Sequence, residues 1–97
     1  MAGSESNFQK KVALWLRLKG CYVLTTTVNP GIPVGCPDII ALLDGGGWVA
    51  LEIKKDAKSK FQPLQKITID KLDAMFYSRV VYESNWDEIK EELMAII

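Results

Sequence analysis

Residues 37–55, PDIIALLDGGGWVALEIKK, contain two apolar runs separated by the sequence DGGG. Apolar runs of this length joined by Asp-Gly are typical of a β-hairpin. The polar residues are the unusual part, because Asp38 opens the first run while Glu52 and Lys54 lie two residues apart near the end of the second. Residues i and i+2 of a strand share a face, so Glu52 and Lys54 are expected to project together.

The length of the hairpin loop decides which face Asp38 occupies. A loop of three or five residues places Asp38 on the face of Glu52 and Lys54, opposite one of the two, whereas a loop of two or four residues turns it away. We predict an odd loop. Two carboxylates and one ammonium group then converge at the open end of the hairpin.

Apolar periodicity and turn signals predict the elements around the hairpin. We expect a helix over residues 4–19 that ends at Gly20, a strand over residues 21–28, and an irregular segment rich in proline and glycine over residues 29–37. The strand over residues 39–43 is apolar on both faces, as a central strand covered on both sides would be. The apolar stripe of the first helix is Phe8, Val12, Trp15 and Leu16.

The second half of the chain predicts a helix opened by Pro63, a strand over residues 79–84, and a last helix with a capping box formed by Asn85 and Glu88. The apolar face of the Pro63 helix is Leu64, Thr68, Leu72, Met75 and Phe76, and that of the last helix is Trp86, Ile89, Leu93 and Ile97. The order is αβββαβα. A helical crossover between the third and fourth strands favours parallel pairing, so we predict an α/β fold with a mixed four-stranded sheet flanked by helices.

Length and composition restrict the classes of protein and of site. A chain of 97 residues forms one domain, residues 1–97, and its 48% apolar and 25% charged residues are typical of a globular protein. The absence of histidine excludes histidine-based triads, and two cysteines, Cys21 and Cys36, exclude Cys/His zinc sites. We expect no membrane span, no signal peptide, a cytoplasmic location and reduced thiols.

The zero net charge is the sum of two unlike parts. Residues 1–66 carry 9 Lys/Arg and 5 Asp/Glu, whereas residues 67–97 carry 3 Lys/Arg and 7 Asp/Glu. Five lysines lie within residues 54–66, where Asp56 is the one acidic residue: Lys54, Lys55, Lys58, Lys60 and Lys66. This basic segment is either a surface that meets phosphates or an ordinary solvated loop.

The predicted cluster of Asp38, Glu52 and Lys54 has a specific chemistry. Two close carboxylates repel each other unless a cation lies between them, and Mg²⁺ accepts carboxylate, carbonyl and water oxygens. Such an ion polarises a phosphoryl oxygen and generates hydroxide, while a lysine orients or deprotonates the attacking water. This chemistry hydrolyses phosphodiesters without histidine. The alternative is an exposed cross-strand Glu–Lys pair that follows a turn-initiating Pro-Asp.

The ordered motifs resemble a known nuclease family. Asp38 in GCPD (35–38), followed by EIK (52–54), is similar to the PD-(D/E)xK signature, and Glu5 before them and Gln65 after them make the chain resemble the virus-type replication-repair nuclease (VRR-NUC) family. The resemblance spans nearly the whole chain. It implies the restriction-endonuclease-like αβββαβα fold, with Mg²⁺ or Mn²⁺ held by Asp38, Glu52 and the Ile53 backbone carbonyl. It also implies that Lys54 is the catalytic lysine.

The resemblance further implies that Glu5 and Gln65 complete the catalytic site, Glu5 at a second metal position or beside the ligands. Glu5 lies three residues before Phe8, hence on the buried side of its helix, but a first-turn acid that favours the helix dipole is the alternative. Gln65 shares a helix side with Ile69, although a polar first-turn residue facing water would fit as well. Gln62 competes with Gln65 for this role.

The implied activity is a divalent-metal-dependent, structure-selective DNA endonuclease, similar to Holliday-junction resolvases, from a bacterial, phage or prophage context. The chain has no sizeable recognition element for base readout, and severing both arms of a junction needs two sites, so we expect branched DNA as partner, a homodimer, and no small-molecule cofactor. The alternatives are a non-catalytic nucleic-acid-binding module and a structural or regulatory dimer. The expected DNA-backbone contacts are Lys55, Lys58, Lys60 and Lys66, with Lys10 and Lys11 as further candidates.

Overall fold

The structure, a computed structural model, describes residues 3–26, 31–33, 35–56 and 63–97, with the side chains of residues 3–5 and 63 outside the described part. Its elements confirm the αβββαβα order. They are α1 (Gly3–Leu18), β1 (Tyr22–Thr25), β2 (Ile39–Leu42), β3 (Trp48–Ile53), α2 (Pro63–Met75), β4 (Ser78–Val81), the 3₁₀ turn η1 (Glu83–Asn85) and α3 (Trp86–Ile96). Among the described residues, none of the helices has the length and apolar character needed to span a bilayer.

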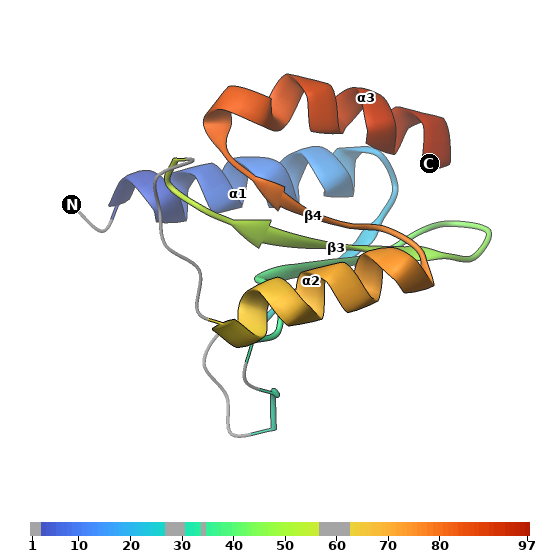
Figure 1. The fold of residues 1–97 in the computed structure, drawn as a ribbon. Helices are drawn as coiled ribbons and strands as arrows, with labels where there is room; N and C mark the ends of the chain where they lie inside the picture. The colour runs from blue at the N-terminus through green and yellow to red at the C-terminus, as the bar shows by residue number, and fades with distance from the viewer. Residues whose placement is uncertain (1–2, 27–30, 34, 57–62) are drawn as a thin grey trace.

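The four strands form one mixed sheet in the order β1-β2-β3-β4. The β1–β2 and β2–β3 pairs are antiparallel, and β3 pairs with β4 in parallel after the chain has crossed through α2. In Figure 1, α1 and α3 lie on one side of the sheet and α2 lies on the other. The predicted α/β class and parallel crossover are therefore confirmed.

The main core lies between the sheet and the α1/α3 layer. Leu51 and Ile53 on β3 are fully buried on this side, and the predicted α1 stripe supplies Phe8, Val12 and Leu16 at 4%, 0% and 0% exposure. Their burial stabilises the fold by about 1.5–3 kcal/mol for each large side chain. α3 adds Trp86, Ile89 and Leu93 to the same cluster. Ile97, also predicted for this stripe, is 41% exposed.

The start of α3 differs from the prediction. Asn85 and Glu88 form no capping box: the Asn85 Oδ1 atom accepts a hydrogen bond from the Tyr82 N–H (2.8 Å), and its Nδ2 donates to the Val80 carbonyl (3.0 Å). The Asn85 side chain has turned back to close η1 at the end of β4, and Glu88 is exposed. The capping-box prediction is wrong because the end of β4 offers the amide both a donor and an acceptor.

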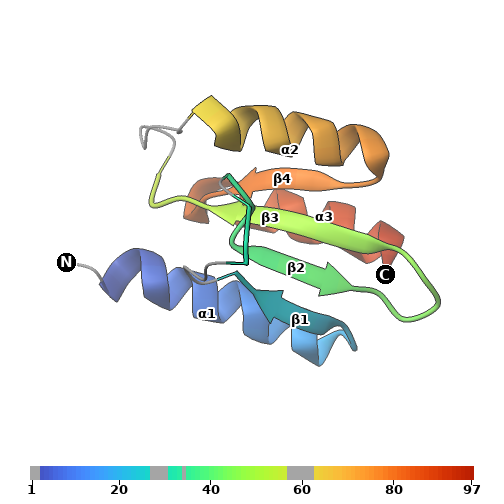
Figure 2. The same cartoon turned by 90° about the horizontal axis from the view of Figure 1, so that it is seen from below.

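α2 covers only part of its side of the sheet. Figure 2 shows α2 beside β4, with β2 and β1 open to the viewer. Ile69 is its buried residue at 6% exposure, whereas Leu64, Met75 and Phe76 of the predicted apolar face are 49%, 60% and 48% exposed. Leu42 on β2 is 44% exposed, so the expectation that this strand is covered on both faces is wrong.

The first turn of α2 packs tightly against the segment that leads into β2. Gly35 has a φ of +86°, and a Cβ atom built on it would lie 2.9 Å from the backbone carbonyl carbon and oxygen of Leu64. Glycine is therefore required at position 35 for two reasons: the left-handed backbone conformation and the close approach of α2. Gly45 in the hairpin loop has a nearly identical φ of +87° with no atom within 4 Å of such a Cβ.

These two glycines give a matched test. Gly45→Ala is expected to cost about 1–2 kcal/mol of unfolding free energy, the penalty for a left-handed L-residue. Gly35→Ala is expected to cost a further 1–3 kcal/mol or so, because the helix backbone has to move. Urea denaturation of both variants measures the difference. Equal losses would contradict the close packing of α2 against Gly35.

Candidate active site

The hairpin register places the two acidic side chains opposite each other. Leu42 pairs with Trp48, so residues 43–47 form an odd, five-residue loop that is closed by a hydrogen bond from the Leu43 N–H to the Gly47 carbonyl (3.1 Å). Ile39 pairs with Leu51, and the same register puts Asp38 opposite Glu52. The predicted parity is confirmed.

The Asp38 carboxylate is held by the neighbouring strand. Its Oδ2 atom accepts a hydrogen bond from the Ile53 N–H at 2.9 Å, and its backbone carbonyl accepts one from the Thr26 N–H at 2.9 Å. The register extended by one more pair sets Pro37 opposite Ile53. The Asp38 side chain thus takes the place of a ladder acceptor, which fixes the carboxylate beside the end of β3.

Pro37 also determines what the Ile53 carbonyl can do. The N–H and C=O of one strand residue point to the same side, so the Ile53 carbonyl points, like its N–H, toward Asp38 rather than toward β4. In a regular ladder the N–H of the residue opposite would satisfy this carbonyl. Proline has no N–H. Because of the Pro-Asp sequence, the Asp38 carboxylate and the Ile53 carbonyl oxygen therefore lie on the same side of β3.

The side chains of Glu52, Lys54 and Gln65 contact one another in a triangle. The Glu52 Oε2 atom accepts a hydrogen bond from Gln65 Nε2 (2.8 Å) and lies 3.3 Å from Lys54 Nζ, and Lys54 Nζ donates to Gln65 Oε1 (3.1 Å). Glu52 lies near the end of β3, Lys54 directly follows that strand, and α2 supplies Gln65 from its first turn. The side chains of Glu52 and Lys54 are 3% and 12% exposed, so water is largely excluded from the contact.

The other oxygen of Glu52 lacks a hydrogen-bond partner in the described part of the chain. This atom, Oε1, is buried. Burial and then the charge of Asp38 raise the pKa of Glu52 from its ordinary value of 4.5 to about 7, against the opposing effect of Lys54. The pKa of Asp38 is also raised, mainly by burial. An isolated buried carboxylate raises the free energy of the folded protein, so a cation bound at this oxygen would stabilise it.

The donor set fits a hard divalent ion. The Asp38 carboxylate, the free oxygen of Glu52 and the Ile53 carbonyl are all oxygen donors, the type that Mg²⁺ prefers. In the part of the chain that the structure describes, no group of three acidic, histidine or cysteine side chains is arranged so that it could hold a metal ion by itself. Water or phosphate oxygens would therefore have to complete the coordination, as is usual for Mg²⁺ at phosphate sites.

The structure brings together five of the residues predicted from the sequence: Asp38, Glu52, Ile53, Lys54 and Gln65. The side chain of Glu5 lies outside the described part, although its backbone belongs to α1. Gln62, Lys58 and Lys60 also lie outside the described residues.

The two remaining lysines predicted to contact DNA are described. Lys55 is exposed directly after the site. Lys66 is exposed on α2, where its Nζ lies 3.3 Å from Asp70 Oδ1 in an i,i+4 pair. Such an exposed pair is weak, at about 0.3–0.5 kcal/mol, so it leaves Lys66 able to exchange Asp70 for another anion.

Two neighbours of the site were not predicted. The Thr26 hydroxyl donates to the Pro37 carbonyl, which anchors the start of β2 to β1. Cys36, a half-buried free thiol, is close enough for the charges of Glu52 and Asp38 to raise its pKa further, after burial as the main cause. Neither residue type carries a motif of its own, and only the position of Cys36 directly before Pro-Asp could have drawn attention to it.

Comparisons of the chain with protein-family models, with curated proteins and with solved structures found no match in any of the three. Function is therefore inferred from the side chains around Glu52 and from the order of the motifs along the chain.

The raised pKa of Glu52 predicts how stability depends on pH. Between pH 4.5 and about 7 the folded protein keeps a proton that the unfolded chain has released, so the unfolding free energy of the metal-free protein falls as the pH rises through this range. Glu52→Gln lacks this titration. In EDTA we expect the variant to gain on the wild type with rising pH, by up to about 3 kcal/mol at pH 8.

Thermal unfolding at pH 5 and pH 8, with EDTA or Mg²⁺, measures the effect. Mg²⁺ should raise the melting temperature of the wild type at pH 8 and leave that of Glu52→Gln unchanged. The control is Glu91→Gln, which removes a charge from an exposed position on α3. Parallel pH profiles for Glu52→Gln and the wild type would contradict the raised pKa of Glu52.

Proposed function

We propose that this chain is a divalent-metal-dependent endonuclease that hydrolyses phosphodiester bonds in branched DNA, with the four-way junction as the leading substrate. The observation that carries the proposal is the buried Glu52, whose one oxygen contacts Lys54 and Gln65 while the other faces no described partner. The VRR-NUC-like order of the motifs and the αβββαβα fold support the same activity.

Asp38, Glu52 and the Ile53 carbonyl would hold Mg²⁺ or Mn²⁺. When bound, such an ion supplies charge to the scissile phosphate and lowers the pKa of a water ligand. The Ile53 N–H keeps the Asp38 carboxylate in place, at 2.9 Å, before any ion binds. The site is thus largely preorganised, which limits the cost of assembling the donors.

Lys54 would act on the attacking water. Its ammonium group is held by Glu52 Oε2 (3.3 Å) and by Gln65 Oε1 (3.1 Å), contacts that fix its position beside the carboxylates. From this position the ammonium group can orient water and offset negative charge on the pentacovalent phosphate, whereas the neutral amine would be needed to deprotonate the water. Gln65 is a positioning residue, because it contacts both Lys54 and Glu52.

The preference for branched DNA is proposed from what surrounds the site. The described elements include no helix or ribbon set apart for insertion into a groove, and Lys55 and Lys66 offer backbone contacts that carry no sequence information. A role in DNA repair in the bacterial cytoplasm, in a phage or prophage context, fits such a substrate.

Resolution of a four-way junction requires cuts in two of its strands. Two active sites are needed for this, so we propose a homodimer. Sedimentation should give twice the mass of the chain, and a cruciform plasmid should be converted directly to the linear form. A monomer that only nicks the plasmid would contradict junction resolution and favour a flap or another single-cut branched substrate.

Cleavage by variants provides the main test. With a synthetic four-way junction and Mg²⁺ or Mn²⁺, Asp38→Asn should abolish cutting because a metal ligand is lost, and Lys54→Ala should slow it by roughly 10²–10⁴-fold. Asp38→Asn should bind the junction at least as tightly as the wild type, since it removes a negative charge that faces phosphate. EDTA should stop cutting by the wild type.

Two residues that lie away from the site provide matched controls. Asp44→Asn removes the same charge in the hairpin loop, and Lys90→Ala removes a lysine on α3 that pairs with Asp87. Both should cut like the wild type. Binding of the junction by the wild type without cutting, across metals and pH, would replace the nuclease by a non-catalytic binding module.

A further inference from the structure

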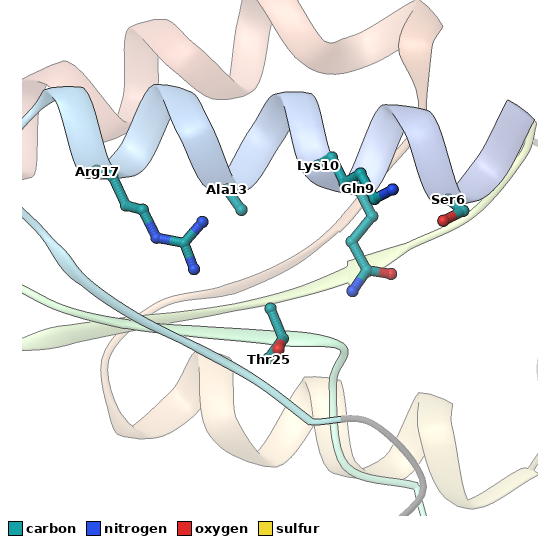
Figure 3. A pocket seen from close by; sticks show the side chains of 6 residues that line it. All are labelled: Ser6, Gln9, Lys10, Ala13, Arg17 and Thr25. Carbon is teal, nitrogen blue, oxygen red and sulfur yellow. The ribbon is translucent and has the colours of Figure 1, made fainter. Parts of the chain in front are cut away.

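A hollow of about 380 Å³ lies between α1 and β1, apart from the triangle at Glu52. Figure 3 shows Arg17 and Gln9 extending from α1 toward Thr25 on the strand below. The residues that line it are Ser6, Gln9, Lys10, Ala13, Arg17 and Thr25. Five of the six carry hydrogen-bond donors on their side chains, and no acidic residue is among them.

Among the described side chains, the cations divide into a paired group and a group without an ion pair, which holds both cations of the hollow as well as Lys11, Lys19, Lys55 and Lys71. Lys54, Lys66, Arg79 and Lys90 each form an ion pair with a carboxylate. Within the described side chains, Lys10 and Arg17 form no ion pair, and both are exposed. The hollow therefore presents positive charge that its own lining does not neutralise.

The backbone of β1 adds a further donor. Thr26 and Asp38 form a hydrogen-bonded pair through the Thr26 N–H, so the adjacent Thr25–Ile39 pair is of the non-hydrogen-bonded type. The Thr25 N–H consequently points away from β2, at the outer edge of the sheet. This edge borders the hollow, and the edges of sheets with outward N–H groups attract anions.

The hollow lies close to the candidate active site along the chain. Thr26, directly after Thr25, is hydrogen-bonded to the backbone of both Pro37 and Asp38. In Figure 2 the ends of β1 and β3 and the beginning of β2 lie at the same end of the sheet as the N-terminus of α1. An extended polyanion held in the hollow can thus continue toward Asp38.

We infer that this hollow binds a backbone phosphate of a nucleic acid, with Arg17 as its main ligand and Lys10, Gln9 and the Thr25 hydroxyl in support. The planar guanidinium group donates two parallel hydrogen bonds to phosphate, and neutral donors complete the anion's shell. The inference rests on the proposed function for its choice of nucleic acid. The hollow adds a second contact point, between α1 and β1 and away from Glu52. Contacts at two points would fix the direction of the bound nucleic-acid strand.

Binding in EDTA separates this contact from catalysis. Fluorescence anisotropy with a labelled four-way junction should give an affinity about 3–10-fold lower for Arg17→Ala than for the wild type, with the salt slope reduced by about one. Lys10→Ala should act in the same direction. The control is Lys19→Ala, which removes a charge directly after α1 and outside the hollow and should change affinity less than about twofold.

The outcomes distinguish the two proposals. If Arg17→Ala and Lys19→Ala bind DNA equally, the phosphate site falls while metal-dependent cutting by the wild type can still stand. If the wild type never cuts but Arg17→Ala alone weakens binding, the phosphate site stands and the nuclease falls.

Two further probes test the chemistry of the ligand. Inorganic phosphate that shifts the Arg17 Nε–H signal in NMR spectra, with no such shift from a DNA oligonucleotide, would overturn the nucleic-acid assignment. Poly-glutamate that binds with the same Arg17 dependence while DNA does not would overturn it in favour of an acidic protein partner.

Discussion

Burial of the Glu52 carboxylate is the constraint on which the site depends. Removing a charge from water costs several kcal/mol, and the described residues compensate one oxygen only, through Lys54 directly after β3 and Gln65 from α2. Gln65 reaches Glu52 because α2 docks over the end of β3, and the hydrogen bond from the Ile53 N–H holds the Asp38 carboxylate. The second oxygen has no partner among the described residues, and the pKa of Glu52 is raised to about 7.

The α/β class and the hairpin could be predicted because they follow from local rules. The two-residue period of strands, the glycine-rich loop and the helical crossover decided the topology and placed Asp38 opposite Glu52. Two of the failures concern choices between partners that satisfy the sequence pattern equally. Asn85 could cap α3 or close the turn after β4, and the apolar residues of α2 could face the sheet or water. Tertiary contacts made both choices.

The spacing of the polar residues identified the carboxylates and the lysine of the site, and the resemblance added Gln65. The sequence could not reveal that Gln65 bridges Lys54 and Glu52, because that contact depends on how α2 docks. Nor could it reveal the role of Pro37, which withholds an N–H from the Ile53 carbonyl while the next side chain takes over the Ile53 N–H. The Pro-Asp pair thus acts in two ways, because Pro37 provides no backbone N–H and Asp38 provides a carboxylate.

The contact between Gly35 and the backbone of Leu64 has an evolutionary consequence. Because nothing larger than hydrogen fits between them, the segment that leads to Asp38 and the helix that carries Gln65 form one mechanical unit. Exchange of either piece for the equivalent piece of another protein would misalign the other. Chimaeras of this fold should therefore be cut outside the unit, and the two pieces should be inherited together.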